Sequence, residues 1–396
     1  MRRIKSLFIV AVAAMAMFGF KATPASAVEI ADGHELYGWG QWWLMLQEDT
    51  MKATDVLRGT GEKSGDTLFG VAERRARIGF KGRLADGMVR YNVQTEWAGS
   101  TFKLNPADPA TQRQGAQLLD YWMSLHPMGD ALEIRVGRFK PFITYEAGVS
   151  SSRNLLMLDR SLAMKSINSG FFAADYEWRD LGIMLKYNVG PAQLIYSITN
   201  GVGGAEEGGG SYFQRPRAFR SNDFVTTAAH SFGVIVNPMA GLRVNASYSF
   251  NKHDNSSVID AVVIDADRSV YSVGFELNSE SGFYADGEYA SLKVETKDDL
   301  ALIGGVPGTR SGYYVRAGFW VIPKSLILTA RYEYFKNDPD GGISAEDTLY
   351  TGAAMYILGP TRITLEYTSA DGDANAMSTY SSTDPTTLRA RFQVAF

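Results

Sequence analysis

The sequence has no cysteine, only four histidines and, after its first residues, no long apolar stretch. The absence of cysteine excludes disulfide scaffolds, thiolate metal sites, thiol nucleophiles and covalent c-type haem attachment. Four histidines are too few for a His-rich metal site, and none has an obvious serine partner in the sequence. Neither G-x-S-x-G nor H-E-x-x-H occurs, so we expect no enzyme activity, no metal site and no cofactor.

The first residues have the pattern of an export signal. A basic start, an apolar stretch at residues 7–20 and a small-residue Ala-x-Ala site predict a secretory signal peptide over residues 1–27. The apolar stretch is too short for a membrane-spanning helix, which needs about 20 residues. Removing residues 1–27 takes away four basic residues and no acidic one, so the net charge falls from −4 to −8. An acidic chain without a basic cluster argues against nucleic acid as a partner.

What the remaining chain does have is alternation of apolar and polar residues with a period of two. The pattern is plain at residues 89–97, 242–250 and 388–396, and successive side chains of a strand point to opposite faces. Segments of about 9–12 residues suit a tilted membrane-spanning strand. We count sixteen, which begin near Glu35, Arg74, Met88, Leu118, Leu132, Leu181, Ala192, Ser231, Leu242, Ser269, Phe283, Tyr313, Leu326, Leu349, Arg362 and Thr386. The first is apolar on both faces, so its inward side stays unassigned.

The connections between these segments alternate between short turns and long polar loops. The turns carry Gly, Pro, Asn or Asp and lie at 85–87, 127–130, 188–191, 237–241, 278–282, 323–324 and 359–360. The loops lie at 48–68, 98–115, 201–223, 251–267, 296–310, 336–347 and 369–385. This rhythm is typical of outer-membrane barrels, because a sheet in lipid must close on itself to pair its backbone.

We therefore predict an all-β fold, in which residues 28–396 form one transmembrane antiparallel β-barrel of about 16 strands in the cell outer membrane. Its outward face would contact outer-membrane lipid and lipopolysaccharide. A soluble β-sandwich also alternates, but the export signal and the loop rhythm argue against it.

Two further stretches are RRARIGFKG at residues 74–82 and VGRFKPF at residues 136–142, the latter continued at 151–163. Both resemble the phosphate-selective porin O and P family of outer-membrane channels. The C-terminal Phe396, with apolar residues at alternate positions before it, resembles the assembly signature of outer-membrane proteins. The family resemblance implies sixteen strands, a homotrimer and an inward-folded third loop that narrows the pore.

The candidate for that constriction is the segment 138–165. It is long, carries charges of both signs, and contains an apolar patch at residues 155–158 that is suited to hold the loop against the wall. The candidate constriction residues are Arg138, Lys140, Glu146, Arg153, Asp159 and Arg160.

The inward positions of the predicted strands are mildly basic, with twelve basic residues against nine acidic ones. The basic positions are Arg75, Arg77, Lys81, Arg90, Arg135, Lys186, Arg243, Arg316, Arg331, Arg362, Arg389 and Arg391. One interpretation is a lumen whose field favours anions. The other is that charges on neighbouring strands form ion pairs that stiffen the wall, such as Arg331 with Glu333 or Arg362 with Glu366.

The sequence thus favours a water-filled pore for passive diffusion of small hydrophilic solutes, with anions such as phosphate or other oxyanions preferred. The alternative is a structural barrel that sheathes or docks a partner, such as a multihaem cytochrome in an electron conduit. Since the chain has no C-x-x-C-H motif, any haem would belong to that partner. A co-purifying red protein would favour the sheath.

Overall fold

The computed structural model describes residues 28–48, 68–98, 117–172, 178–201, 228–252, 258–259, 262–263, 266–296, 307–340, 342, 344–372 and 386–396. The signal peptide predicted over residues 1–27 and most of the predicted long loops lie outside them. The barrel strands are β2 (His34–Glu48), β3 (Leu68–Leu84), β4 (Val89–Glu96), β5 (Gln117–Leu125), β7 (Leu132–Phe139), β8 (Asp180–Val189), β9 (Ala192–Thr199), β10 (Ala229–Met239), β11 (Leu242–Asn251), β14 (Ala266–Asn278), β15 (Phe283–Thr296), β16 (Gly308–Ile322), β17 (Leu326–Pro339), β18 (Ala345–Leu358), β19 (Thr361–Gly372) and β20 (Thr386–Ala395).

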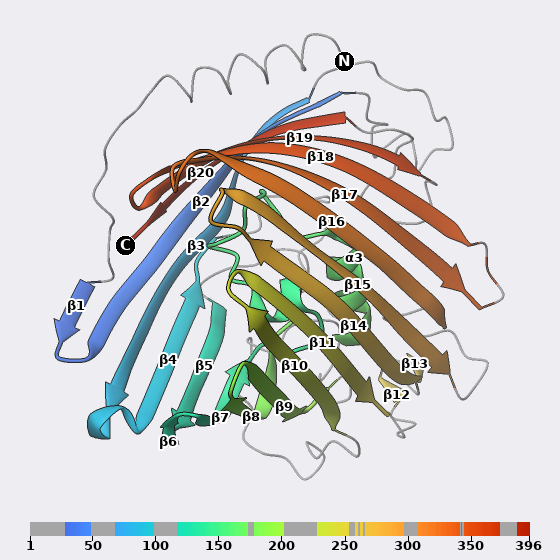
Figure 1. Ribbon diagram of the computed structural model, residues 1–396. Helices are drawn as coiled ribbons and strands as arrows, with labels where there is room; N and C mark the ends of the chain where they lie inside the picture. Colours follow the sequence, from blue (N-terminus) through green and yellow to red (C-terminus); the bar gives the residue numbers. More distant parts are fainter. Residues whose placement is uncertain are drawn as a thin grey trace.

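These sixteen strands form a closed antiparallel barrel (Figure 1), which confirms the predicted fold and strand count. Each strand pairs with its neighbours in the chain, and β2 closes the ring by pairing with β20. At the seam, the backbone amide of Phe396 donates to the carbonyl of Gly38, and the Gly38 amide donates back, both at 3.0 Å. The C-terminal residue therefore takes part directly in closure.

Short elements accompany the barrel. The strand β1 (Val28–Ala31) pairs with the start of β2, and β6 (Pro127–Asp130) lies in the turn between β5 and β7. A 3-10 turn η1 (Ala85–Gly87) joins β3 to β4, and β12 (Val258–Ile259) pairs with β13 (Val262–Val263) in a separate two-stranded sheet. Among the described residues, no helix is long and apolar enough to span a membrane.

The period-two pattern separates an apolar outer face from a polar inner face. On β11, Val244 and Tyr248 are exposed on the outside, whereas Asn245 and Ser247 are buried inside. The structure also shows which face of the first strand points inward, which the sequence pattern did not assign. Its inward residues include Tyr37, Trp39 and Gln41, as the lining of the lumen and the inward contacts of Gln41 show.

The turns lie where the sequence predicts them, but the loop at 336–347 is shorter than the sequence predicts. The chain reverses at Gly190 and Gly241 with φ of +55° and +77°, a conformation that glycine adopts without a Cβ penalty. In contrast, β17 and β18 stay paired as far as Asn337 with Ala345. The hydrophobic pattern ends where contact with lipid ends, but backbone pairing continues beyond that level.

The strands are unequal in length around the barrel. We call β4, β5, β7, β8 and β9 the short wall, because each has 8–10 residues. We call β14–β19 the long wall, because each has 12–15 residues. The inward residues of the two walls make different contacts inside the barrel.

Candidate functional site

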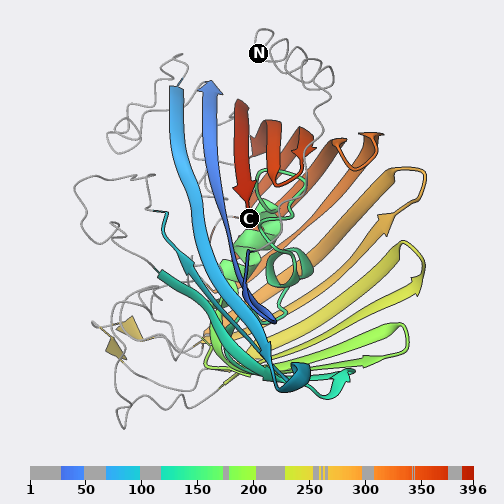
Figure 2. The ribbon, with the colours of Figure 1, turned by 90° about the vertical axis from the view of Figure 1, so that its left-hand side faces the viewer.

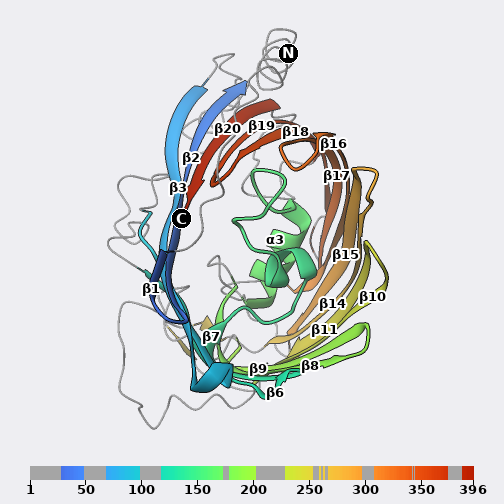
Figure 3. The ribbon, with the colours of Figure 1, turned by 60° about the vertical axis from the view of Figure 1, so that its left-hand side comes forward.

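The chain between β7 and β8 enters the barrel instead of leaving it. We call residues 140–172 the inserted segment; it contains a π-helical turn η3 (Tyr145–Val149) and the helix α3 (Leu162–Phe172). Figure 2 and Figure 3 show α3 and the turns before it inside the ring of strands. The segment therefore occupies part of the lumen.

The helix α3 lies against the long wall through an apolar core. It contacts β14, β15, β16 and β17. Its Met164, Ile167 and Phe171 are buried with inward wall residues such as Leu292 and Phe335. Lumen walls of membrane barrels are usually polar, so this apolar patch marks the place that the helix covers.

Buried wall glutamates bind the backbone amides of the inserted segment. Glu288 accepts from the amides of Tyr145 and Glu146 at 2.5 and 2.9 Å. In the same way, Glu333 accepts from the Leu162 amide at 2.6 Å, and Glu366 accepts from the Leu158 amide at 2.8 Å. Carboxylate–amide bonds of this kind are strong because one partner is charged.

Wall arginines bind the carbonyls of the same segment. The Arg391 guanidinium donates to the carbonyls of Leu155 and Met157, both at 3.1 Å. Arg331 donates to the Asp159 carbonyl at 3.0 Å, and Arg362 to the Arg153 carbonyl at 2.8 Å. Three arginines predicted to line the pore thus hold the inserted segment in place.

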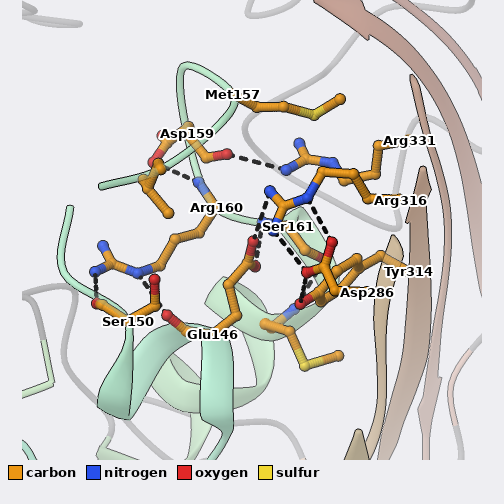
Figure 4. A network of polar contacts seen from close by, with 12 residues as sticks. Glu146, Ser150, Met157, Asp159, Arg160, Ser161, Asp286, Tyr314, Arg316 and Arg331 are labelled. Carbon is orange, nitrogen blue, oxygen red and sulfur yellow. Dashed lines mark hydrogen bonds and ion pairs between the residues drawn. The ribbon is translucent and has the colours of Figure 1, made fainter. Parts of the chain in front are cut away.

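A buried charge network joins the segment to β15 and β16 (Figure 4). Arg316 binds Asp286 through two hydrogen bonds of 2.7 and 2.6 Å, and its guanidinium lies 3.7 Å from Glu146. Glu146 accepts from the Ser161 amide at 2.7 Å, and Arg160 donates to the Glu146 carbonyl at 3.0 Å. Burial raises the pKa of the Glu146 carboxyl. Glu146 and Arg160 are almost fully buried, so their contacts fix the conformation of the segment.

Asp159 is the second acidic anchor within the segment. It pairs with Lys165 at 3.0 Å and approaches Arg74 of β3 to 4.0 Å. Burial opposes its ionisation, but these cations outweigh burial and hold the pKa of Asp159 well below its usual value.

The open part of the lumen lies between the inserted segment, β2–β4 and the short wall. We call this space, of about 600 Å³, the main cavity. Its lining has seven basic and two acidic side chains. They are Arg77, Lys81, Arg135, Lys140, Arg153, Arg179 and Lys186, with Glu35 and Asp120.

Most of these cations have a carboxylate partner. Arg179 binds Asp120 at 3.0 and 2.8 Å, and three further contacts follow the same plan: Arg77 with Glu96 at 2.6 Å, Lys81 with Glu35 at 2.9 Å, and Arg135 with Glu133 at 2.6 Å.

The two cations that the inserted segment adds to the main cavity differ from the wall cations. Lys140 donates to the Ala147 carbonyl at 3.2 Å and lies near the Trp178 ring. For the Arg153 guanidinium, the described part of the chain provides no carboxylate within ion-pair distance. The lining of the main cavity as a whole therefore carries more basic than acidic side chains, seven against two.

Comparison with known proteins identifies this arrangement. A family model described as phosphate-selective porin O and P matches residues 54–396. The chain belongs to this family. The porin matches no curated protein sequence.

Solved structures share its fold at low sequence identity. They include an anion-selective porin from Comamonas acidovorans (14% identity, TM-score 0.60, 92% of this chain and 99% of that chain) and Salmonella typhi OmpF in complex with daunomycin (14%, TM-score 0.61, 94% and 100%). A third is the trimer form of Vibrio cholerae OmpT (12%, TM-score 0.57, 92% and 99%). Family and fold together make this chain an outer-membrane channel.

The structure places one predicted constriction residue elsewhere. Arg138 is part of β7, directly opposite Tyr121 of β5, and it shares its face with the exposed Val136. Because neighbours alternate, Arg138 lies on the face opposite to Arg135 and is absent from the lining of the main cavity. Arg138 is thus a strand residue and not part of the loop, and its role at the constriction stays a prediction.

The remaining predicted residues of the porin fall into three groups. Arg75 donates to Gln41 at 3.1 Å, and Arg389 pairs with Glu366, so both belong to the wall. Arg243 and Arg316 line a second cavity of about 420 Å³. Arg90 pairs with Asp130 at 2.5 Å near the short turns. The predicted Arg331–Glu333 pair forms at 2.5 Å, whereas Glu366 pairs with Arg389 instead of Arg362.

Sequence reasoning missed several contacts. Arg179 and Trp122 line the main cavity, but Arg179 stands just before a strand, where alternation gives no signal. The sequence also indicates no serine partner for His126, yet Ser124 Oγ lies 3.0 Å from His126 Nε2. Both are buried in the wall, so we treat this contact as structural.

Proposed function

We propose that this outer-membrane channel is a homotrimeric diffusion pore for small hydrophilic solutes that prefers anions, phosphate and other oxyanions among them. The observation that carries the proposal is the excess of basic over acidic side chains in the lining of the main cavity, seven against two. In a narrow passage a fixed charge acts at a lower effective dielectric than at the surface, so a few cations dominate selectivity.

The channel interpretation is preferred over a sheath for a cytochrome. In support, the inserted segment is fastened to the wall by buried charged groups, and the spaces beside it are about 600 and 420 Å³. Spaces of this size suit small solutes. A cytochrome that co-purifies and blocks conductance would overturn this choice.

Reversal potentials in planar bilayers test the anion preference. The wild type should prefer chloride over potassium, and Lys140→Glu with Arg153→Glu should move the potential toward cation preference. The control is Lys252→Glu, which reverses one charge at an exposed position beyond the end of β11 and is matched with Lys140→Glu alone. A cation-selective wild type, or an equal shift in the control, would contradict the proposal.

The trimer and the lipid contacts complete the proposal. Support comes from family membership and from a fold neighbour described as a trimer. The exposed apolar outer face is suited to outer-membrane lipid and lipopolysaccharide. Crosslinking in mild detergent should trap trimers; monomers alone would count against this assembly.

A further inference from the structure

One side of the main cavity is apolar. We call Trp122, Phe139, Phe142, Met184 and Ile195 the apolar shelf. All five line the cavity, and they form one cluster together with Ile235 and Tyr145. The Phe142 ring lies directly on the backbone of Gly233 in β10, where any Cβ would clash with it. The apolar shelf is therefore a tightly packed part of the cavity lining.

Two cations lie directly opposite residues of this shelf on neighbouring strands. Arg135 lies directly opposite Met184, and Lys186 directly opposite Ile195, in the strand register. Such cross-strand neighbours have Cβ atoms about 5 Å apart. The Arg135 guanidinium also stacks on the Trp122 ring at 3.8 Å. Positive and apolar groups thus alternate over a few ångströms.

The facing side of the cavity carries neutral hydrogen-bonding groups among charged ones. The Tyr37 hydroxyl donates to Asn92 Oδ1 at 2.6 Å, and Gln94 Nε2 donates to the Tyr37 hydroxyl at 3.0 Å. Ser150, Ser151 and Ser152 of the inserted segment lie on this side together with the charged lining residues of β2 and β3. A solute in the cavity therefore meets cations and apolar groups on one side, and hydrogen-bonding and charged groups on the other.

We propose that the main cavity binds organic carboxylates with a compact apolar body, of the size of benzoate, more tightly than phosphate or acetate. This inference rests on the proposed anion preference and names the solute class of the same site. The carboxylate lies at Arg135, Lys140 or Lys186, and the apolar body lies on the Trp122 ring, the shelf residue that is only partly buried. An inorganic oxyanion satisfies the cations but leaves this ring in contact with water. The cavity volume of about 600 Å³ accommodates such a molecule.

The test is block of chloride current by sodium benzoate, acetate and phosphate in planar bilayers. Benzoate should half-block the wild type at a concentration about tenfold lower than acetate or phosphate. Trp122→Ala should raise the benzoate value about tenfold and change the acetate value less than about twofold. The matched control is Trp320→Ala, which removes the same ring from the second cavity.

Equal block by benzoate and acetate in an anion-preferring wild type would overturn this inference and leave the proposed function standing. A wild type without anion preference would instead overturn the proposed function, and this inference with it. If Trp122→Ala fails to assemble, Met184→Ser tests the same shelf with a smaller change of volume. Equal weakening of benzoate block by Trp320→Ala would also count against the shelf.

Discussion

The long wall and the short wall carry the same alternating pattern, yet they use their inward polar residues for different tasks. On the long wall, Glu333 and Glu366 bind backbone amides of the inserted segment, and apolar residues such as Leu292 receive α3. On the short wall, Arg135 and Lys186 border an open cavity. An inward charge therefore acts on the permeating solute only where the inserted segment leaves it accessible.

The largest effect should come from Glu366 on the long wall. Glu366→Ala removes the acceptor for the buried Leu158 amide and the partner of the partly buried Arg389. Breaking a buried pair of this kind costs about 3–5 kcal/mol. We expect a lower unfolding temperature and a larger, noisier single-channel conductance. Glu366→Gln keeps an acceptor oxygen and should lose less. Unchanged conductance and unfolding in Glu366→Ala would mean that the wall contacts do not hold the segment.

Neutralising one cation that holds the inserted segment and one that lines the main cavity should separate stability from selectivity. Arg391→Gln removes donors to the Leu155 and Met157 carbonyls, so it should lower the unfolding temperature and leave the permeability ratio nearly unchanged. Lys140→Gln should reduce anion preference with a smaller effect on unfolding. Thermal unfolding and reversal potentials measure both. The reverse pattern would contradict the division between cations that hold the segment and cations that line the cavity.

Acid should loosen the inserted segment through Asp159. Its pKa in the folded protein is depressed, so the ionised carboxylate stabilises the fold above the unfolded value of about 3.9. That contribution is lost as the pH falls from this value through the depressed pKa. We expect unfolding temperature to drop more steeply below about pH 4 in the wild type than in Asp159→Asn. Parallel pH curves for the two proteins would exclude this contribution.

Alternation and loop rhythm sufficed to predict the barrel, because lipid imposes both on the sequence. They could not predict which inward charges stay accessible. Arg391 and Lys140 each stand next to a phenylalanine in the sequence, but only the tertiary structure shows that Arg391 binds Leu155 while Lys140 lines the cavity. Arg138 was assigned to the loop for a related reason. It lies one residue from the end of β7, and strand ends are the least reliable feature of the pattern.

The smallest effect should come from Arg90, which the sequence placed among the pore-lining residues. Its partner Asp130 is largely exposed, and the pair stands near the short turns, outside the lining of the main cavity. Arg90 lowers the pKa of Asp130 through a hydrogen bond and its charge, but exposed pairs contribute little to stability because water and salt screen them. Arg90→Ala should therefore leave conductance, reversal potential and unfolding temperature unchanged within error. If it shifts the reversal potential as Lys140→Gln does, selectivity depends on all inward cations, and accessibility beside the inserted segment is not what distinguishes the two walls.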